Sequence, residues 1–406
     1  ANFFFFFFTL NRATIVEIVG GRRAGNFTLL VHFFFYFIHA GVNPQALLHI
    51  NFEEPTLASL INIEVLDTLY ETYRARVYPE GRAYIFLDEV QNVKEWERWA
   101  RARNESENIK IILTGSSSEL LSRELGTLLT GRHLSFEIYP LSFREVLEFR
   151  QIDIPTKPWP LKTPPRLYQA LLDYAQWGGM PRVILSESED LKERLLKRYF
   201  EDMLYRDVIN RHQIRDVHTL RNLAVYLLTQ TASLISFKRL CDLFSASQDL
   251  IQSYCQYLHE AFLIDMLPLY TLKTGERTRN PLKAHAIDLG LRNVVSFGRS
   301  TDQNKLIESM VYHHLLSTKQ DGIFYWQGKG AIDLLVRQGM EITHAIQVTH
   351  SGLENPATLD REQSSLQAAT KAFPDAQKQL IALDFPPSMT LPKEIELIPL
   401  WHLLLS

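Results

Sequence analysis

The sequence is poor in the features that mark secreted or membrane proteins. Only Cys241 and Cys255 occur among 406 residues, too few for a disulfide scaffold and without metal-ligand spacing. The phenylalanine run at Phe3–Phe8 is far shorter than the roughly 20 residues that a membrane helix needs, and it lacks the flanking pattern of a signal peptide. These absences predict a cytoplasmic protein without a membrane segment.

The chain also lacks a strong charge of either sign. A formal net charge of -3 gives no overall attraction to nucleic acid, so any such contact would need a local basic surface. Hydrophobic residues at 46% and charged residues at 22% are typical of folded globular proteins. The length predicts two to four domains of about 100 to 200 residues each.

Five short β-rich runs punctuate the first 140 residues, separated mostly by segments long enough for helices. They occupy residues 14–19, 47–52, 84–87, 110–113 and 134–139. This alternation predicts an α/β fold, with a parallel sheet covered by helices on both faces. Ligands of such sheets bind at the carboxyl ends of the strands, so the residues after each strand are the candidates for a site.

A glycine-rich loop follows the first run. It reads Gly20, Gly21, Arg22, Arg23, Ala24, Gly25, Asn26, Phe27 and Thr28. Both glycines of the phosphate-binding pattern GxxxxGK[ST] are present, but Asn26 and Phe27 replace its last two residues. In a working loop, backbone N–H groups and a helix N-terminus hold the phosphates, a lysine reaches them, and a hydroxyl holds Mg²⁺. A strand-to-helix turn without a ligand is the alternative.

The third run ends in two adjacent carboxylates, Asp88 and Glu89. In Mg²⁺-nucleotide chemistry, such an acidic Walker B segment would use Asp88 to hold the metal and Glu89 to orient and deprotonate the attacking water. A solvated loop start is the alternative interpretation.

Small polar residues follow the fourth run, and Ser116 among them is a candidate sensor of the γ-phosphate or of the attacking water. A serine here also suits the N-cap of a following helix. Arg132, before the fifth run, is a candidate arginine finger toward the nucleotide of a neighbouring subunit, or else a surface residue.

In this order, the motifs resemble a large family of archaeal and bacterial AAA-type P-loop ATPases. The resemblance rests on the loop at 20–25, Asp88-Glu89-Val90-Gln91, Thr114-Gly115-Ser116, Gly131-Arg132, the segment 139–145, Gly178-Gly179-Met180-Pro181, and the segment 199–209. It implies an ATPase core at 1–150, a proline-rich connector and helical lid at 151–215, a winged helix at 216–290, and a domain similar to restriction endonucleases at 291–406. It also implies ATP or ADP and Mg²⁺ as cofactors.

The chain departs from the family at Asn26 and Phe27, which remove the lysine and the Mg²⁺-binding hydroxyl together. One donor to a developing charge stabilises a transition state by about 3 kcal/mol, so we expect impaired hydrolysis. Two interpretations stay open. The chain is an inactivated relative, or residues 26 and 27 differ from those of the natural protein.

Two short amphipathic patterns, at 236–243 and 247–258, predict a helix-turn-helix. Basic residues follow in a polar stretch that could form a wing contacting DNA phosphates. They are Lys273, Arg277, Arg279 and Lys283. A protein-interaction module is the alternative, since neither charge nor spacing decides.

The last segment only partly matches a metal-dependent nuclease. Glu308 on a predicted helix and Asp333 are present, but Gln347 and Thr349 stand where a second carboxylate and a lysine are needed. A nuclease-like fold without nuclease activity is therefore expected.

We thus predict an AAA-type ATP-binding protein that couples its nucleotide state to DNA- or protein-binding domains. The alternative is a non-enzymatic binding module on an inactivated ATPase scaffold. The expected partners are a nucleotide, DNA or a protein, and other subunits in a homo-oligomer.

Overall fold

The computed structural model describes residues 14–57, 61–116, 133–157, 159–160, 162–273, 281–296, 303–318, 320–350, 353–385 and 392–406. The phenylalanine run Phe3–Phe8 lies outside these residues. The chain divides into two compact units, called unit 1 and unit 2. Unit 1 comprises Ala1–Tyr139 with Glu260–Phe262, and unit 2 comprises Pro140–His259 with Leu263–Ser406.

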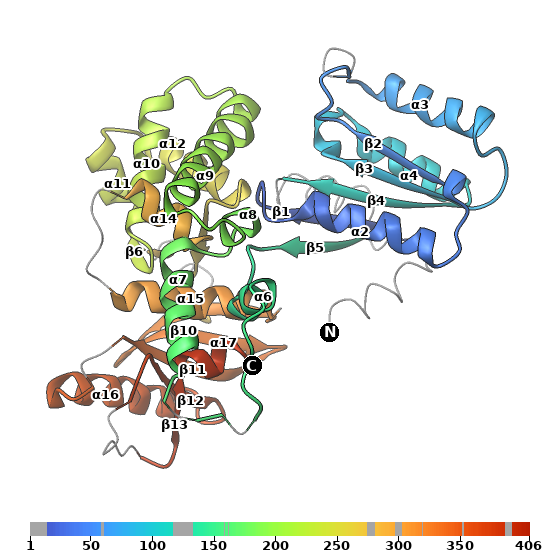
Figure 1. Ribbon diagram of the computed structural model, residues 1–406. Helices are drawn as coiled ribbons and strands as arrows, with labels where there is room; N and C mark the ends of the chain where they lie inside the picture. Colours follow the sequence, from blue (N-terminus) through green and yellow to red (C-terminus); the bar gives the residue numbers. More distant parts are fainter. Residues whose placement is uncertain are drawn as a thin grey trace. The chain divides into compact units, whose positions relative to one another are not determined.

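Unit 1 alternates strands and helices (Figure 1). Its elements are β1 (Ile15–Gly20), α2 (Asn26–His39), η1 (Pro44–Ala46), β2 (Leu47–Asn51), α3 (Ile63–Arg76), β3 (Ala83–Asp88), η2 (Val90–Asn92), α4 (Trp96–Ser106), β4 (Ile109–Gly115) and β5 (His133–Ile138). The strands form one sheet in the order β2-β3-β4-β1-β5. Every neighbouring pair is parallel, which confirms the five strands and the parallel sheet predicted from the sequence.

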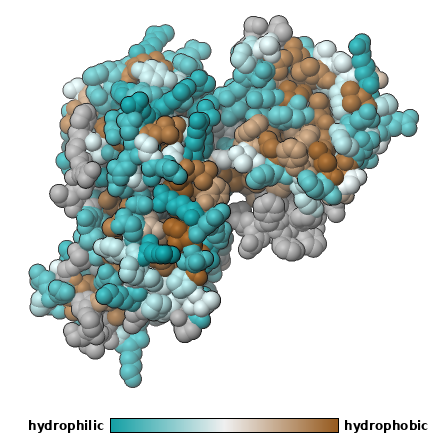
Figure 2. Space-filling model, in the orientation of Figure 1, coloured by the Kyte–Doolittle hydropathy of each residue, from teal (hydrophilic) through white to brown (hydrophobic). Residues whose placement is uncertain are grey.

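Apolar residues on both faces of the strands hold this sheet in the core of unit 1. Every residue of β1 and of β4 is buried, as expected for parallel strands covered on both sides. Helix α2 packs on one face, where its residues Phe33 and Phe37 meet Phe86 of β3. Figure 2 shows apolar residues gathered on the visible face of unit 1 over α2, where Phe27 and Phe35 are about half exposed.

The first part of unit 2 is mainly helical, as the sequence predicted. Its helices are α6 (Phe143–Phe149), α7 (Pro165–Trp177), α8 (Pro181–Ile184), α9 (Glu189–Asp202), the π-helix η3 (Met203–Asn210), α10 (Val217–Thr229), α11 (Phe237–Phe244) and α12 (Gln248–Glu260). Helices α11 and α12 confirm the predicted helix pair. Three short strands accompany them, β6 (Ser233–Ile235), β7 (Ile264–Leu267) and β8 (Leu282–Ala286), in a sheet of order β6-β8-β7.

The last part of unit 2 is built on a second five-stranded sheet, of order β13-β12-β11-β10-β9. Its elements are α14 (Leu289–Val295), α15 (Gln303–Ser317), β9 (Gly322–Gln327), β10 (Ala331–Gln338), β11 (Glu341–Thr349), α16 (Pro356–Ala372), β12 (Gln377–Ala382), β13 (Ile395–Pro399) and α17 (Leu400–Leu404). Strands β9, β10 and β11 are antiparallel neighbours, whereas β11, β12 and β13 are parallel.

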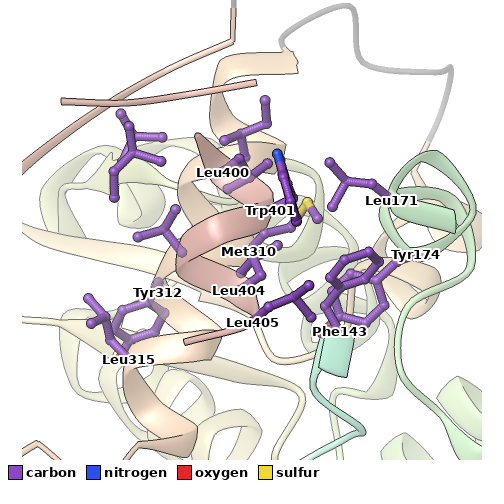
Figure 3. Packing of buried hydrophobic residues seen from close by; sticks show 14 of the residues in the cluster. Phe143, Leu171, Tyr174, Met310, Tyr312, Leu315, Leu400, Trp401, Leu404 and Leu405 are labelled. Carbon is purple, nitrogen blue, oxygen red and sulfur yellow. The ribbon is translucent and has the colours of Figure 1, made fainter. Parts of the chain in front are cut away.

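One apolar core joins this second sheet to helices from earlier in the chain. Phe143 of α6 and Tyr174 of α7 pack in it with Met310 of α15 and Trp401 of α17 (Figure 3). Helix α6, which the sequence analysis grouped with residues 1–150, therefore belongs to unit 2.

The Gly178-Gly179 turn packs closely against the start of α14. The N–H of Gly179 donates to Asp288 Oδ2 at 2.7 Å, and its carbonyl accepts from the N–H of Leu141 at 2.8 Å. A Cβ atom on Gly179 would lie 2.2 Å from the carbonyl oxygen of Leu141. Because that oxygen is backbone and cannot turn away, only glycine fits at position 179.

We therefore predict that Gly179→Ala lowers the free energy of unfolding by about 3 kcal/mol through overpacking. Gly339→Ala is the matched control, because Gly339 has a positive φ of 59° but no atom near the added methyl group. Its cost should be about 1 kcal/mol, from backbone strain alone. Urea unfolding followed by tryptophan fluorescence measures both, and equal losses would contradict the close-packing explanation.

Candidate functional site

The carboxyl ends of β1, β3 and β4 meet at one edge of the unit 1 sheet. Strand β4 pairs with β1 on one side, with Val19 opposite Gly115, and with β3 on the other. The glycine-rich loop after β1, the carboxylates after β3 and Ser116 after β4 therefore lie at the same edge. This is where open α/β sheets bind their ligands.

The loop between β1 and α2 retains the backbone shape of an anion site. Gly25 has a φ of 124°, which favours glycine, and the N–H of Ala24 donates to the carbonyl of Gly21 at 3.0 Å. Helix α2 then begins at Asn26, with no side chain capping its N-terminus and no acidic residue in its first turn. Its first N–H groups and its dipole therefore favour a negatively charged ligand.

Asn26 stands at the position of the expected lysine, but its side chain bonds to backbone carbonyls. Its Nδ2 atom donates to the carbonyl of Gly20 at 2.7 Å and to that of Gly115 at 3.3 Å, tying the end of β1 to the end of β4. Its Oδ1 atom is buried and has no hydrogen-bond partner among the residues that the structure describes. Asn26 is uncharged and its amide links two strand ends, so it adds rigidity but no electrostatic attraction for phosphate.

Phe27 and Thr28 contribute nothing polar that the structure places at the site. Phe27 is half exposed, and its ring contacts His49 with 6.2 Å between ring centroids. Thr28 is exposed on the first turn of α2. The hydroxyl that would hold Mg²⁺ has therefore been replaced by an aromatic ring.

The carboxylate of Asp88 is held in place by burial and by a hydrogen bond. Asp88 is buried, with 5% of its surface exposed, and its carboxylate accepts a hydrogen bond from the hydroxyl of Thr114. Burial raises the pKa of Asp88 above its ordinary value, and the bond from Thr114 opposes that rise. A divalent cation beside this carboxylate would lower its pKa again.

Glu89 is held in a strained backbone conformation. Its φ of 53° is left-handed, which is uncommon outside glycine, and its N–H donates to Thr114 Oγ1 at 3.2 Å. The amide of Gln91 donates to the Glu89 carboxylate and, at 3.4 Å, to Ser116 Oγ. Strain of this kind is often retained at functional sites.

Arg22 supplies a positive charge near this acidic pair. Its Nη1 atom lies 2.8 Å from Glu53 Oε1. Burial raises the pKa of Glu89, and the charge of Arg22 opposes that effect. Arg22 therefore faces the carboxylates, whereas Arg23 is exposed.

The structure thus brings together most of the predicted residues. The loop 20–25, Asn26, Asp88, Glu89 and Ser116 meet at one edge, while Arg132 lies outside the described residues. Sequence reasoning assigned no role to Thr114, Gln91 or Glu53, which contact the acidic pair or Arg22. Thr114 and Gln91 lie in two of the sequence segments on which the family resemblance rests, and this could have marked them as candidates.

The expectation that Lys283 is a DNA-contacting wing residue was wrong. Lys283 is buried in β8, and its Nζ lies 2.7 Å from Glu308 Oε1 and 3.5 Å from Asp333 Oδ1. Two carboxylates from later in the chain hold it inside unit 2, so it cannot reach a phosphate. Arg277 and Arg279 lie outside the described residues.

Two negative findings apply to the part of the chain that the structure describes. No group of three or more His, Cys, Asp and Glu residues there has the arrangement of a metal site. Within the same residues, no helix combines the length and the apolar character that crossing a bilayer requires.

Comparison with known proteins matches two parts of the chain to families. Residues 12–147 match a family described as an AAA domain. Residues 168–302 match a domain of unknown function, DUF8612.

Two curated relatives align over most of the chain. The uncharacterized protein MJ1544 of Methanocaldococcus jannaschii is 32% identical over 330 residues, covering 79% of this chain and 72% of that protein. An uncharacterized protein of Haemophilus influenzae is 27% identical over 365 residues, covering 88% of each. The solved AMPPCP-bound DnaA from Aquifex aeolicus covers 62% of this chain and 84% of that one, at 15% identity and a TM-score of 0.26, which is too weak to support an argument.

Proposed function

The chain belongs to the protein family that includes MJ1544 and carries an AAA domain, and on that premise we propose that unit 1 binds ATP and ADP at the loop 20–25. We further propose that the bound nucleotide controls the binding of a partner by unit 2. Hydrolysis by this chain is slow, because Asn26 and Phe27 stand where the phosphate-binding loop needs a lysine and a hydroxyl group.

The observation that carries the proposal is the joint placement of the loop and the carboxylates. The turn ending at Gly25 leads into the uncapped N-terminus of α2, and Asp88 and Glu89 lie at the same edge of the sheet. Backbone N–H groups supply the phosphate contacts, which do not depend on the side chains at 26 and 27. This placement supports nucleotide binding as the function of the loop.

Mg²⁺ fits the acidic half of the site and not the loop half. Asp88 would hold it, and Glu89 would orient and deprotonate water, with Gln91 fixing the Glu89 carboxylate. When bound, the metal would neutralise charge on the transferred phosphoryl group. The Nδ2 atom of Asn26 already donates to two backbone carbonyls. Neither Asn26 nor Phe27 can therefore supply a positive charge or a hydroxyl group to the phosphates and the metal.

We predict saturable binding of ATP and ADP by the full chain, measured by isothermal titration calorimetry. Gly25→Ala should weaken it at least about tenfold, a loss of about 1.4 kcal/mol, because alanine is strained at a φ of 124°. Gly41→Ala is the matched control. Gly41 follows the other end of α2, also has a positive φ, 85°, and also has open space around it.

The control should lose stability and keep its affinity for nucleotide. Absence of saturable binding by the wild-type chain would reject the nucleotide-binding function and leave the non-enzymatic module. An equal loss of affinity in both variants would show that binding does not depend on the loop.

For the partner of unit 2, we propose a protein rather than DNA. Helix α12 would be the recognition helix of a helix-turn-helix, and its sequence from Gln248 to Glu260 contains no lysine or arginine. The exposed side chains on it are Gln248, Asp249, Gln252 and His259. Phosphate contacts supply most of the affinity for DNA, so a helix without cations and with Asp249 at its start is poorly suited to it.

We therefore expect negligible binding of a 30-base-pair duplex, with a Kd above about 100 µM at 50 mM salt. Fluorescence anisotropy at 50 and 200 mM salt measures this. Tight binding that weakens steeply with salt, and that Lys238→Ala with Arg239→Ala on α11 abolishes, would identify DNA as the partner instead.

A further inference from the structure

Unit 2 contains a buried charged centre formed by residues from three elements. Lys283 comes from β8, Glu308 from α15 and Asp333 from β10. Lys283 and Glu308 are each 8% exposed, and the ammonium contacts both carboxylates. The N–H of Val348 also donates to Asp333 Oδ2 at 3.1 Å. A cavity of about 340 Å³, lined by Lys283, Lys305, Glu308 and Asp333, adjoins the centre.

A restriction-type nuclease would hold its metal between such carboxylates, but the residues here do not fit a metal. The Lys283 ammonium already lies within 2.7 and 3.5 Å of the two carboxylates, the space in which a cation would have to be. Gln347 is neutral, and Thr349 stands where the nuclease lysine would be. A divalent ion placed beside the ammonium would be repelled by it.

The charges of the centre are balanced without a metal. Burial by itself lowers the pKa of Lys283, but Glu308 and Asp333 together raise it above its ordinary value, so the ammonium is retained. Burial and the neighbouring Asp333 raise the pKa of Glu308 to about 8. The Lys283 ammonium is therefore kept between the two carboxyl groups and supplies the positive charge of the centre.

The centre also links two parts of unit 2. Lys283 belongs to the sheet β6-β8-β7 beside the helix pair α11 and α12, whereas its partners belong to the C-terminal part. The same two parts are joined by main-chain bonds. The N–H of Tyr270 donates to the carbonyl of Tyr325 at 2.7 Å, and the N–H of Tyr325 donates to the carbonyl of Pro268 at 3.1 Å.

We propose that Lys283 is the permanent cation of this centre and that its ammonium occupies the position between the carboxylates that a metal ion would need. The centre does not cleave nucleic acid. It fastens the helix pair and its sheet to the C-terminal sheet, so that these parts of unit 2 present one rigid surface to a partner.

The test compares Lys283→Met with Lys305→Met in the full chain, by thermal unfolding in EDTA and in Mn²⁺. Lys283→Met should lower the Tm by about 10 °C, because it leaves buried carboxyl groups without their cation. Lys305→Met should change the Tm by less than about 2 °C, because a partly exposed lysine contributes little. In an Asp88→Asn background, which removes the candidate metal ligand of unit 1, the Tm should be the same in EDTA and in Mn²⁺.

If Lys283→Met does not fold, Lys283→Met with Asp333→Asn keeps the proposal testable. Removing both charges should recover folding, and failure to recover it would overturn the proposed charge pairing. So would a Lys283→Met variant as stable as the wild type. A metal bound at this centre would overturn the proposal. It would show as a Tm that rises with Mn²⁺ in the wild type and in Asp88→Asn but not in Asp333→Asn.

Discussion

The pairing of β4 with both β1 and β3 determines what unit 1 can do. It places the loop after Gly20, the carboxylates of Asp88 and Glu89, and Ser116 at one edge of a sheet whose central strands are completely buried. Buried parallel strands allow no change of register without exposing apolar side chains or breaking the hydrogen-bond ladder. The geometry of the edge is therefore set by the core, and the side chains placed on it decide the chemistry.

At this edge, the two halves of the site have diverged. Around Asp88, the polar contacts from Thr114 and Gln91 form a connected network that orients both carboxylates. Across from it, Asn26 has become a structural link between two strand ends. Under the proposed function, ordered carboxylates beside a loop that lacks the motif lysine suit nucleotide recognition more than hydrolysis.

Sequence reasoning predicted local features well and long-range contacts poorly. The strands of unit 1 were predictable because each is a short run rich in apolar and β-branched residues, and Asp88 and Glu89 because they stand at the end of such a run. The helix pair was predictable from its apolar period. The position of Lys283 was not, since its carboxylate partners lie 25 and 50 residues further along the chain and no local pattern announces them. The bonds of Asn26 depend likewise on Gly115, which is 89 residues away.

The C-terminal part follows the same physical logic as unit 1. In both places, a polar side chain forms internal bonds, Asn26 with the strand-end carbonyls and Lys283 between two carboxylates. Internal bonds of this kind hold elements in place, which favours stable surfaces for binding over chemical turnover.

The central claim is that the carboxylates are competent and that only the loop limits hydrolysis. Steady-state ATPase assays of the Asn26→Lys, Phe27→Thr double variant test it most directly. We expect Mg²⁺-dependent hydrolysis at least about 100-fold faster than the wild type, and its loss when Glu89→Gln is added. A double variant that binds ATP but hydrolyses it no faster than the wild type, or whose activity is indifferent to Glu89→Gln, would contradict the account.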